Sequence, residues 1–408
     1  MRFTHVLTTS IVSLFLISFL AASPALGFIE REYTIREVLD ACTNIVFGEV
    51  KSVDTRRMQA IITVKEDVKG KSNLKEIKMN FQTGQYKKNT SPRKMVRLLE
   101  QGMPIIVFYR DHYGIDSMCF IDDTWFQMRL YQGRSRGTGR SGSSWWSFTH
   151  IDPMMNRTFK GKTKTFQNVV RDMLDGKMWV TATKDALKIL VLTGNSTSPT
   201  WGQTHVHTNT MTYEYQALRN IKKVGKRPTA LESTKIRTLP NLQKANILWL
   251  GYEEISSFGR YLLPKKTETA IKNFVKNGGI VIVSGQDSTM QKPCGVGWLQ
   301  GNLTGVESPP DRFFEVANKE VSLFTTPNII QSGKIYTDDA WVDWEKSDEI
   351  FATTPERNEL VIGARKYGKG LYIITSLRND NQYTVSMNKG LMENIIHYAA
   401  NRIERKNR

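Results

Sequence analysis

The stretch Phe274-Val275-Lys276-Asn277-Gly278-Gly279-Ile280-Val281-Ile282-Val283-Ser284-Gly285 decides the fold of the second half of the chain. Glycine commonly ends a helix, and an unbroken apolar run is typical of a strand that is buried on both faces. Residues 266–276 precede this run with apolar side chains at helical spacing. The stretch therefore predicts a helix, a glycine cap and a buried parallel strand.

Similar units lie on both sides of this stretch. Residues 187–194 and 245–251 are two more apolar strands, and a helix is predicted over 213–221. Near the end of the chain, 360–363 and 370–375 read as paired strands, and 391–403 as a final helix. Continuous apolar strands that alternate with helices predict a doubly wound, mostly parallel α/β sheet over 186–405, covered on both faces.

The first half of the chain has a different pattern. Short apolar or alternating segments follow one another between turns, which predicts five or six strands in a small barrel or sandwich. A short amphipathic helix over 166–174 closes this part, so we expect an all-β domain over 28–177 and a linker over 178–185. The expected strands lie at residues 45–50, 59–64, 75–81, 104–109, 118–121 and 125–128.

The first 27 residues have the layout of a secretory signal. Arg2 precedes an apolar stretch over 11–22, and Ser23-Pro24-Ala25-Leu26-Gly27 supplies small residues for cleavage after Gly27. We therefore expect a secreted or periplasmic protein with no transmembrane helix after cleavage. The alternative is that the stretch is retained as an N-terminal membrane anchor, which would favour an envelope-anchored assembly factor.

The chain is strongly basic, with 57 Lys and Arg against 39 Asp and Glu and a formal net charge of +18. Such an excess suits nucleic acid, anionic headgroups, an acidic polysaccharide or a plain solvated surface. Export argues against nucleic acid as a partner, which leaves a plain solvated surface as the first interpretation of the charge and carbohydrate or an acidic envelope polymer as the candidate partner. A basic Gly/Ser/Arg loop over 133–144, which contains Arg136, precedes Trp145-Trp146. Arg136 and the two indoles are candidate polymer contacts, with core packing of the tryptophans as the alternative.

Three cysteines leave at least one unpaired within the chain. Cys42 and Cys119 both fall in the predicted barrel, and an oxidising compartment would permit a disulfide between them. Spacing alone leaves that disulfide open.

The second half resembles the class I glutamine amidotransferase-like fold, in particular its trehalose-utilisation-type relatives. The resemblance is carried by residues 188–194, 247–251, 274–285 and the closing Tyr367-Gly368-Lys369-Gly370-Leu371-Tyr372. Less specifically, residues 40–175 resemble an OB-type barrel such as the netrin modules, by their strand layout and by Gly48, Gly70 and Gly102 in the turns.

In catalytic members of that superfamily a Cys follows the strand equivalent to 280–283, and a His and a Glu complete a triad. Ser284 stands at that position, and Ile282 replaces the glycine that a strained nucleophile elbow needs. No matching His is evident in the late region. The resemblance therefore implies an amidotransferase-like domain without its triad.

A second candidate site is His205-Val206-His207, in the loop that follows the first strand of the α/β domain. Ligands of open α/β sheets bind at the carboxyl ends of strands, and this loop leaves such an end. The two imidazoles could bind a divalent metal, hydrogen-bond a sugar, or simply be solvated. A metal needs a third ligand, for which Asp287 and Glu253-Glu254 are the candidates.

Together these features predict a non-catalytic binding or interaction protein, with no cofactor predicted and a divalent metal left open. The alternative is a hydrolase or sugar-modifying enzyme at the strand ends, with Ser284, Asp287, His205 and His207 as its groups. A base within hydrogen-bond reach of the Ser284 hydroxyl, in one cleft, would favour the enzyme.

Overall fold

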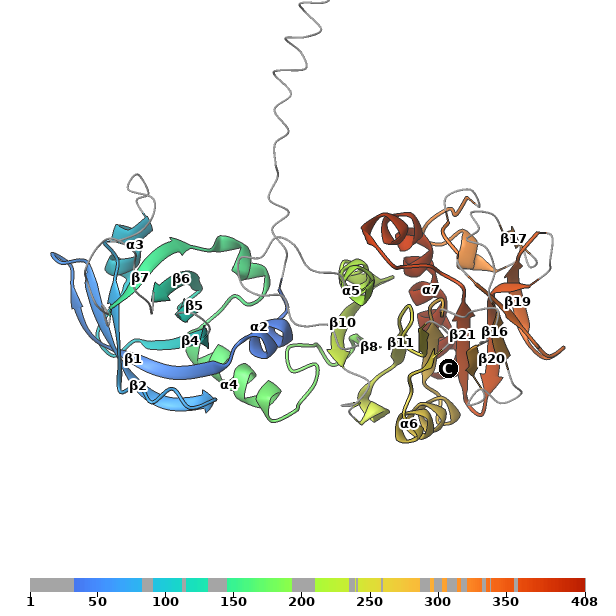
Figure 1. Cartoon of the computed structure of the whole chain (residues 1–408), viewed down its shortest axis with the longest axis horizontal. Coiled ribbons are helices and arrows are strands. Elements are labelled where there is room, and N and C mark those ends of the chain that lie inside the picture. Colours follow the sequence, from blue (N-terminus) through green and yellow to red (C-terminus); the bar gives the residue numbers. More distant parts are fainter. Residues whose placement is uncertain are drawn as a thin grey trace, which may run out of the picture. The chain divides into compact units, whose positions relative to one another are not determined.

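The computed structural model describes residues 33–82, 91–111, 115–130, 145–192, 210–234, 239, 241–257, 260–286, 294–296, 303–306, 314–316, 321–331, 335–337, 339–355 and 359–407. These residues form two compact units (Figure 1). The first unit extends to Asn168 and the second begins at Val169, so the boundary lies inside helix α4 (Thr163–Leu174).

The first unit is a closed barrel. Its described strands follow the order β1-β2-β3-β7-β6-β5-β4, and β1 also pairs with β4. Closure depends on a parallel pairing of β3 with β7, which the sequence pattern did not predict because β7 follows the Gly/Ser/Arg loop. The barrel, rather than the sandwich alternative, is thus the observed form. The strands are β1 (Asn44–Asp54), β2 (Gln59–Lys69), β3 (Glu76–Asn80), β4 (Pro104–Asp111), β5 (Ile115–Ile121), β6 (Thr124–Leu130) and β7 (Trp145–Ile151).

Gly48 shows why this barrel can curve at β1. The pairing of β1 with β2 shifts register between Phe47 and Gly48, which marks an irregularity of the bulge type. A Cβ at Gly48 would lie 2.7 Å from Ile62 Cγ2 and 2.8 Å from the Thr63 carbonyl oxygen. Only glycine fits there without a shift of the neighbouring strand.

Among the described residues, three helices accompany the barrel strands: α2 (Ile35–Ala41), α3 (Ser91–Leu98) and α4. The first is fixed by a capping box, in which Thr34 and Glu37 each bond the other's backbone N–H. Phe166 of α4 stacks on Phe159 with ring centroids 4.1 Å apart and meets Trp125 edge to face. The predicted helix 166–174 is therefore present, and an aromatic cluster holds its first turns.

The second unit contains a mixed sheet of twelve strands among the described residues. Its centre is parallel, in the order β10-β8-β11-β14-β21, and antiparallel strands extend it on both sides. The parallel strands are β8 (Leu187–Leu192), β10 (Arg227–Thr234), β11 (Ile247–Leu250), β14 (Ile280–Val283) and β21 (Gly370–Thr375). The others are β9 (Lys223–Val224), β15 (Cys294–Val296), β16 (Leu303–Val306), β17 (Glu315–Val316), β18 (Ala340–Val342), β19 (Glu349–Thr353) and β20 (Leu360–Tyr367). A separate two-stranded sheet pairs β12 (Ser256–Ser257) with β13 (Arg260–Tyr261).

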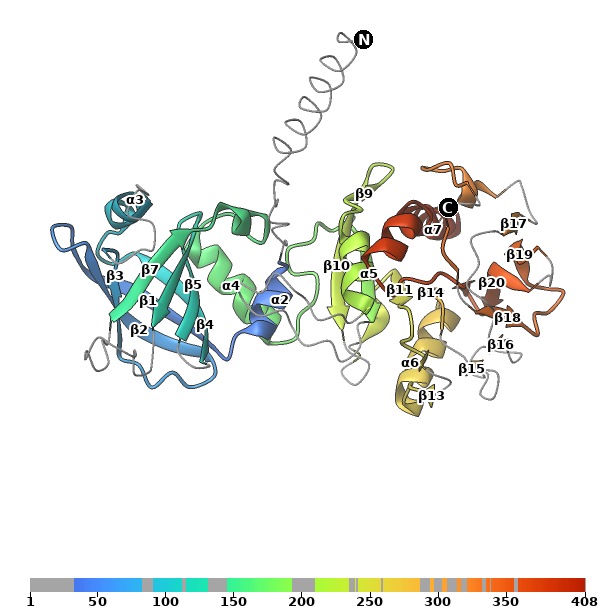
Figure 2. The same ribbon diagram turned by 45° about the horizontal axis from the view of Figure 1, so that its top comes forward.

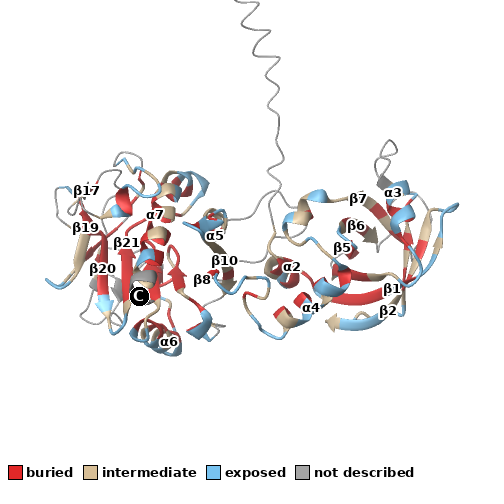
Figure 3. Cartoon of the chain, turned by 180° about the vertical axis from the view of Figure 1, so that it is seen from behind, coloured by how far each residue is buried: buried red, intermediate tan, exposed pale blue. Residues whose placement is uncertain are grey.

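Both faces of this sheet are covered, as predicted. Alternate residues along the central strands enter two different cores: Ile280 and Ile282 join one, Val281 and Val283 the other. The first core contains α5 (Thr210–Arg219) and α7 (Gln382–Asn407), and the second contains α6 (Lys265–Lys276). Figures 1 and 2 show α5 and α7 on the side of the strands opposite α6, and β21 is buried along most of its length (Figure 3).

Most predicted elements of this unit are present, with shifted ends. The final helix begins at Gln382 instead of 391, because Asn381 caps its first turn by accepting from the backbone N–H groups of Tyr383 and Thr384. Strand β10 was missed because its sequence is largely polar and only partly buried. Short 3-10 turns complete the structure: η1 (Pro153–Arg157), η3 (Leu242–Lys244) and η4 (Ser322–Phe324). Within the described part of the chain, no helix has the length and apolar character required to cross a membrane.

Candidate functional site

Ser284 lies at the carboxyl end of β14, where the parallel strands bring together polar groups from distant parts of the chain. Its hydroxyl is 2.7 Å from Glu214 Oε1, which α5 supplies. Asn379, just beyond β21, donates from Nδ2 to the same carboxylate oxygen at 2.6 Å and to Ser284 Oγ at 3.1 Å. All three side chains have no exposed surface.

Two further amides extend this group. Asn388 of α7 donates from Nδ2 to Asn379 Oδ1 at 3.0 Å and to the carbonyl oxygens of Tyr336 and Arg378. Gln286 accepts from the backbone N–H groups of Ile255 and Ser256, and donates to the carbonyl oxygens of Gly251 and Ser284. We call Glu214, Ser284, Gln286, Asn379 and Asn388 the strand-end cluster.

Burial raises the pKa of Glu214 above that of an ordinary carboxyl group, and donors from Ser284, the Tyr252 backbone and Asn379 lower it in part. The Tyr252 N–H lies 3.0 Å from Oε2. The Trp249 indole acts in the same direction, although its N–H does not reach hydrogen-bond geometry. No ion pair to Glu214 occurs among the described residues. Neutral donors offset only part of the cost of burying the charge, so burial keeps the Glu214 pKa raised and the carboxyl protonated to a higher pH.

The backbone around Ser284 does not form a nucleophile elbow. In such an elbow, the N–H of the residue after the nucleophile contributes to the oxyanion hole. Here the Gly285 N–H donates to the Leu377 carbonyl oxygen at 3.0 Å, and the Ser284 N–H donates to the Leu250 carbonyl oxygen at 2.8 Å. A Cβ at Gly285 would lie 2.7 Å from the Leu377 oxygen, so glycine serves this close approach. Both backbone donors are already engaged.

The cluster therefore has the parts of a Ser–carboxylate pair without access to them. A carboxylate 2.7 Å from a hydroxyl has the distance for proton transfer. A substrate carbon must also reach the oxygen, and Ser284 is 0% exposed. As it stands, the arrangement fixes α5, β14, β21 and α7 to one another.

The other predicted site residues of this unit have different outcomes. Glu253 and Glu254 follow β11 at the same end of the sheet, and the Glu253 N–H donates to the Gly285 carbonyl oxygen at 3.1 Å. Glu254 is buried, and Glu253 has a positive φ of 59°. His205, His207 and Asp287 lie outside the described residues, as does Arg136. Among the described residues no group of His, Cys, Asp and Glu could hold a metal ion.

The structure decides two alternatives that the sequence left open in the barrel. Trp146 is 2% exposed and packs edge to face on Tyr109 in the barrel core, so it cannot contact a polymer. Trp145 points the other way along β7, is partly exposed, and has Lys78 Nζ 6.0 Å from its ring centre. Cys42 and Cys119 do not form a disulfide, since Cys119 lies in the barrel interior on β5 and Cys42 follows α2.

Sequence reasoning missed four members of the cluster: Glu214, Gln286, Asn379 and Asn388. Glu214 stands beside Tyr215 in a helix that packs its apolar side on the sheet. A carboxyl next to a core residue of this helix was the sequence signal that could have identified Glu214. Asn379 and Asn388 had none, because asparagine after a strand or in a helix is ordinary on a surface.

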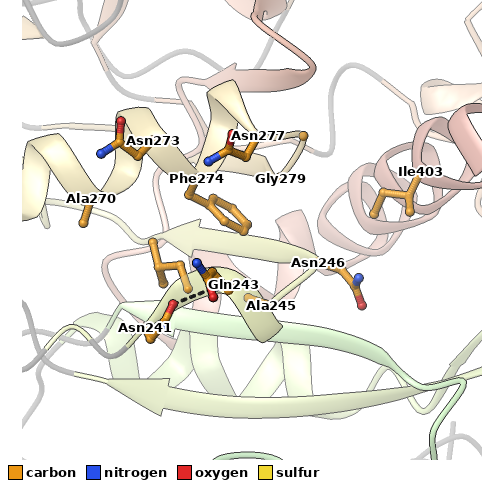
Figure 4. Close-up of a pocket in the computed structure, with 12 residues that line it drawn as sticks. Asn241, Gln243, Ala245, Asn246, Ala270, Asn273, Phe274, Asn277, Gly279 and Ile403 are labelled. Atoms are coloured by element: carbon orange, nitrogen blue, oxygen red, sulfur yellow. Dashed lines mark hydrogen bonds between the residues drawn. The ribbon is translucent and has the colours of Figure 1, made fainter.

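A second polar feature lies at the opposite, amino end of the same strands. A cavity of about 520 Å³ is bounded by η3, the start of β11, the last turns of α6 and Ile403 of α7 (Figure 4). No charged residue of the described part of the chain lines it. Its polar wall consists of five carboxamide side chains, those of Asn241, Gln243, Asn246, Asn273 and Asn277. We call this cavity the carboxamide pocket.

No family model matches the chain, and no curated protein matches it. Solved structures do. A putative ThuA-like protein from Bacteroides uniformis is 13% identical with a TM-score of 0.34, over 55% of this chain and 95% of that one. Cytoplasmic protein STM3548 from Salmonella typhimurium is 10% identical with a TM-score of 0.35, over 52% and 97%. The cold-adapted β-galactosidase from Rahnella sp. R3 is 13% identical with a TM-score of 0.33, over 62% and 40%. These are distant structural matches of an amidotransferase-like and ThuA-like α/β fold.

Proposed function

We propose that the chain is a non-catalytic binding protein whose α/β unit serves as a rigid scaffold. One observation carries this proposal: Ser284, at the position of the superfamily nucleophile, is fully buried, and its hydroxyl contacts Glu214 and Asn379. The donors that would stabilise an oxyanion are bonded to Leu250 and Leu377. A nucleophile needs an exposed oxygen and unoccupied donors.

The proposed ligand is carbohydrate or an acidic polymer. The support is the net charge of +18, which attracts polyanions. Direct binding of glycans and polyanions to the whole chain identifies the ligand.

Covalent labelling tests the non-catalytic part of the proposal. We expect a fluorophosphonate probe to leave Ser284 unmodified in the folded chain, because the hydroxyl is inaccessible. Ser284→Ala should instead lower the free energy of unfolding by about 1 kcal/mol through the lost hydrogen bonds. Ser386→Ala, on the exposed side of α7, is the control. Stoichiometric labelling that disappears in Ser284→Ala would sink the proposal.

One observation favours the competing hydrolase: the 2.7 Å contact between Ser284 Oγ and Glu214 Oε1. In that case Glu214 acts as the base and a conformational opening must admit substrate. Hydrolysis of a glycan or ester panel that both Ser284→Ala and Glu214→Gln abolish, while each variant stays folded by circular dichroism, would establish the enzyme.

We further propose an extracytoplasmic location. The support is residues 1–27, which lie outside the described residues and have the charged, apolar and small-residue zones of a signal. N-terminal sequencing of the protein recovered from an exporting cell should begin at Phe28. Recovery with Met1 intact in the cytoplasm would overturn the location and leave the binding proposal standing.

A further inference from the structure

We propose that the amino end of the parallel sheet binds an acidic saccharide, with its sugar ring in the carboxamide pocket and its anionic group beside Lys369. This inference rests on the proposed binding function and places its site at the edge of the sheet opposite the strand-end cluster. The carboxyl ends, where ligands of open α/β sheets usually bind, are occupied by polar groups that bond to one another.

The amides of the pocket are largely uncommitted. Within the described part of the chain, the side chains of Gln243, Asn273 and Asn277 have no hydrogen-bond partner, and all three are exposed. Asn246 is oriented: its Oδ1 accepts from the Lys188 N–H at 2.9 Å and from Arg227 Nη2 at 3.2 Å, which leaves its N–H groups as donors. Asn241 Oδ1 caps η3. A carboxamide both donates and accepts, as a sugar hydroxyl does.

The pocket also has an apolar wall. Phe274 lies against the backbone at Gly279, where an added Cβ would be 2.3 Å from the ring, and Leu242 and Ala245 adjoin it. Figure 4 shows the ring between Asn277 and the η3 residues. An aromatic face among amides, within a cavity of about 520 Å³, suits the apolar C–H face and the hydroxyl rim of a pyranose.

A cationic cavity adjoins this pocket. It measures about 200 Å³ and shares Gly278 and Ile403 with the carboxamide pocket, and it is lined by Lys366, Lys369 and Arg402. Its charge is partly neutralised by Glu349, which contacts Arg402 and lies 3.9 Å from Lys366 Nζ. Three cations against one carboxylate leave an excess of two positive charges.

Lys369 is the cation best placed to meet a ligand. It is exposed, follows Gly368 in the turn between β20 and β21, and forms no ion pair with the described residues. The turn is fixed, because the Lys369 N–H donates to the Lys276 carbonyl oxygen at 2.9 Å. A carboxylate, sulfate or phosphate on a sugar held in the pocket would face this charge, which is why we infer an acidic rather than a neutral saccharide.

Titration calorimetry on the whole chain tests the inference with three probes: an oligogalacturonate, a maltooligosaccharide of equal length and inorganic phosphate. We expect the oligogalacturonate to bind at least about tenfold more tightly than either of the others, and its affinity to fall with added salt. Both Lys369→Glu and the Asn273→Ala/Asn277→Ala double variant should weaken its binding at least about tenfold.

The chain offers a matched control. Lys389 is an exposed lysine on α7, the helix that supplies Ile403 to the pocket, and it precedes Ile403 by about 21 Å along the helix axis. Lys389→Glu makes the same charge reversal in the same unit, away from both cavities. It should change the affinity less than about twofold, because exposed charges beyond a Debye length are largely screened.

The remaining outcomes overturn the inference in different ways. Phosphate that binds as tightly as the oligogalacturonate, without need of Asn273 and Asn277, would reduce the site to a simple anion site. Tight oligogalacturonate binding that survives all the variants would place the ligand elsewhere and leave the binding function intact. Absence of oligogalacturonate binding at millimolar concentration would reject the acidic saccharide. Labelling of Ser284 would instead reject the non-catalytic function, so the two failures are distinguishable.

Discussion

The two ends of the parallel sheet differ in how their polar side chains are satisfied. At the carboxyl ends, Glu214, Ser284 and Asn379 are fully buried and bond to one another. At the amino ends, Asn273 and Asn277 are exposed on the wall of a cavity and have no partner within the described residues. Polar groups that satisfy each other rigidify a fold, whereas unsatisfied ones at a concave surface are available to a ligand. The polar groups at the carboxyl ends of the strands therefore do not by themselves locate a ligand site.

The largest effect should come from breaking the strand-end cluster at its centre. Asn379→Ala removes donors to Glu214 and Ser284 and the acceptor for Asn388, and it leaves buried groups without partners. We expect the free energy of unfolding to fall by about 3 kcal/mol, measured by urea denaturation. A loss below about 1 kcal/mol would mean that water or another group already satisfies the cluster.

The next prediction compares two glycines at the amino end of the sheet, one beside backbone atoms and one beside a side chain. A Cβ at Gly370 would meet the Val275 and Gly279 carbonyl oxygens at 2.1 and 2.3 Å, and these belong to the backbone. The three atoms nearest to a Cβ at Gly279 all belong to the ring of Phe274, a side chain that borders the cavity. We expect Gly370→Ala to lower the free energy of unfolding by about 3 kcal/mol and Gly279→Ala by about 1 kcal/mol. Equal losses would show that Phe274 cannot move.

The third effect concerns the protonation of Glu214. Its pKa is raised in the folded state by burial, so the folded chain binds this proton more tightly than the unfolded chain. The resulting stability is fully present below the ordinary carboxyl pKa and is lost as pH rises through the raised one. In that window the wild type should lose up to about 1.4 kcal/mol per pH unit relative to Glu214→Gln.

Denaturation curves at a series of pH values from 4 upward measure this difference, with Glu100→Gln on the surface as the control. The control should follow the wild type. If Glu214→Gln does so as well, the carboxyl is not titrating as its burial requires.

The smallest expected effect on stability comes from the exposed amides at the amino end of the sheet. Asn273→Ala and Asn277→Ala replace exposed side chains, so each should change the free energy of unfolding by less than about 0.5 kcal/mol. The same substitutions should weaken oligogalacturonate binding, as argued above. A large loss of stability from either variant would indicate that these amides hold the fold together and would remove them as ligand contacts.

Much of the fold could be predicted from local pattern. The run 280–283 and its neighbour 247–250 are apolar without alternation, as is 187–192 apart from Lys188, and each forms a strand with residues buried on both faces. Of the site, only Ser284 and the position of Glu253 at the strand ends were identified. The sequence left the burial of Trp146 and the pairing of Cys42 with Cys119 open, because the direction of a side chain on β7 and the neighbours of Cys119 depend on barrel register.

The sequence by itself determined where buried strands and helices lie, because apolar periodicity is a local property that burial selects. Tertiary structure alone decided what meets at the strand ends. Glu214 and Asn379 are 165 residues apart in the sequence. They touch because β21 pairs with β14 in the sheet, although β15 to β20 lie between these two strands in the sequence. The tertiary structure also decided that the barrel closes by pairing β3 with β7. The apolar pattern of a strand shows which residues are buried, and it does not show which distant strand is its partner.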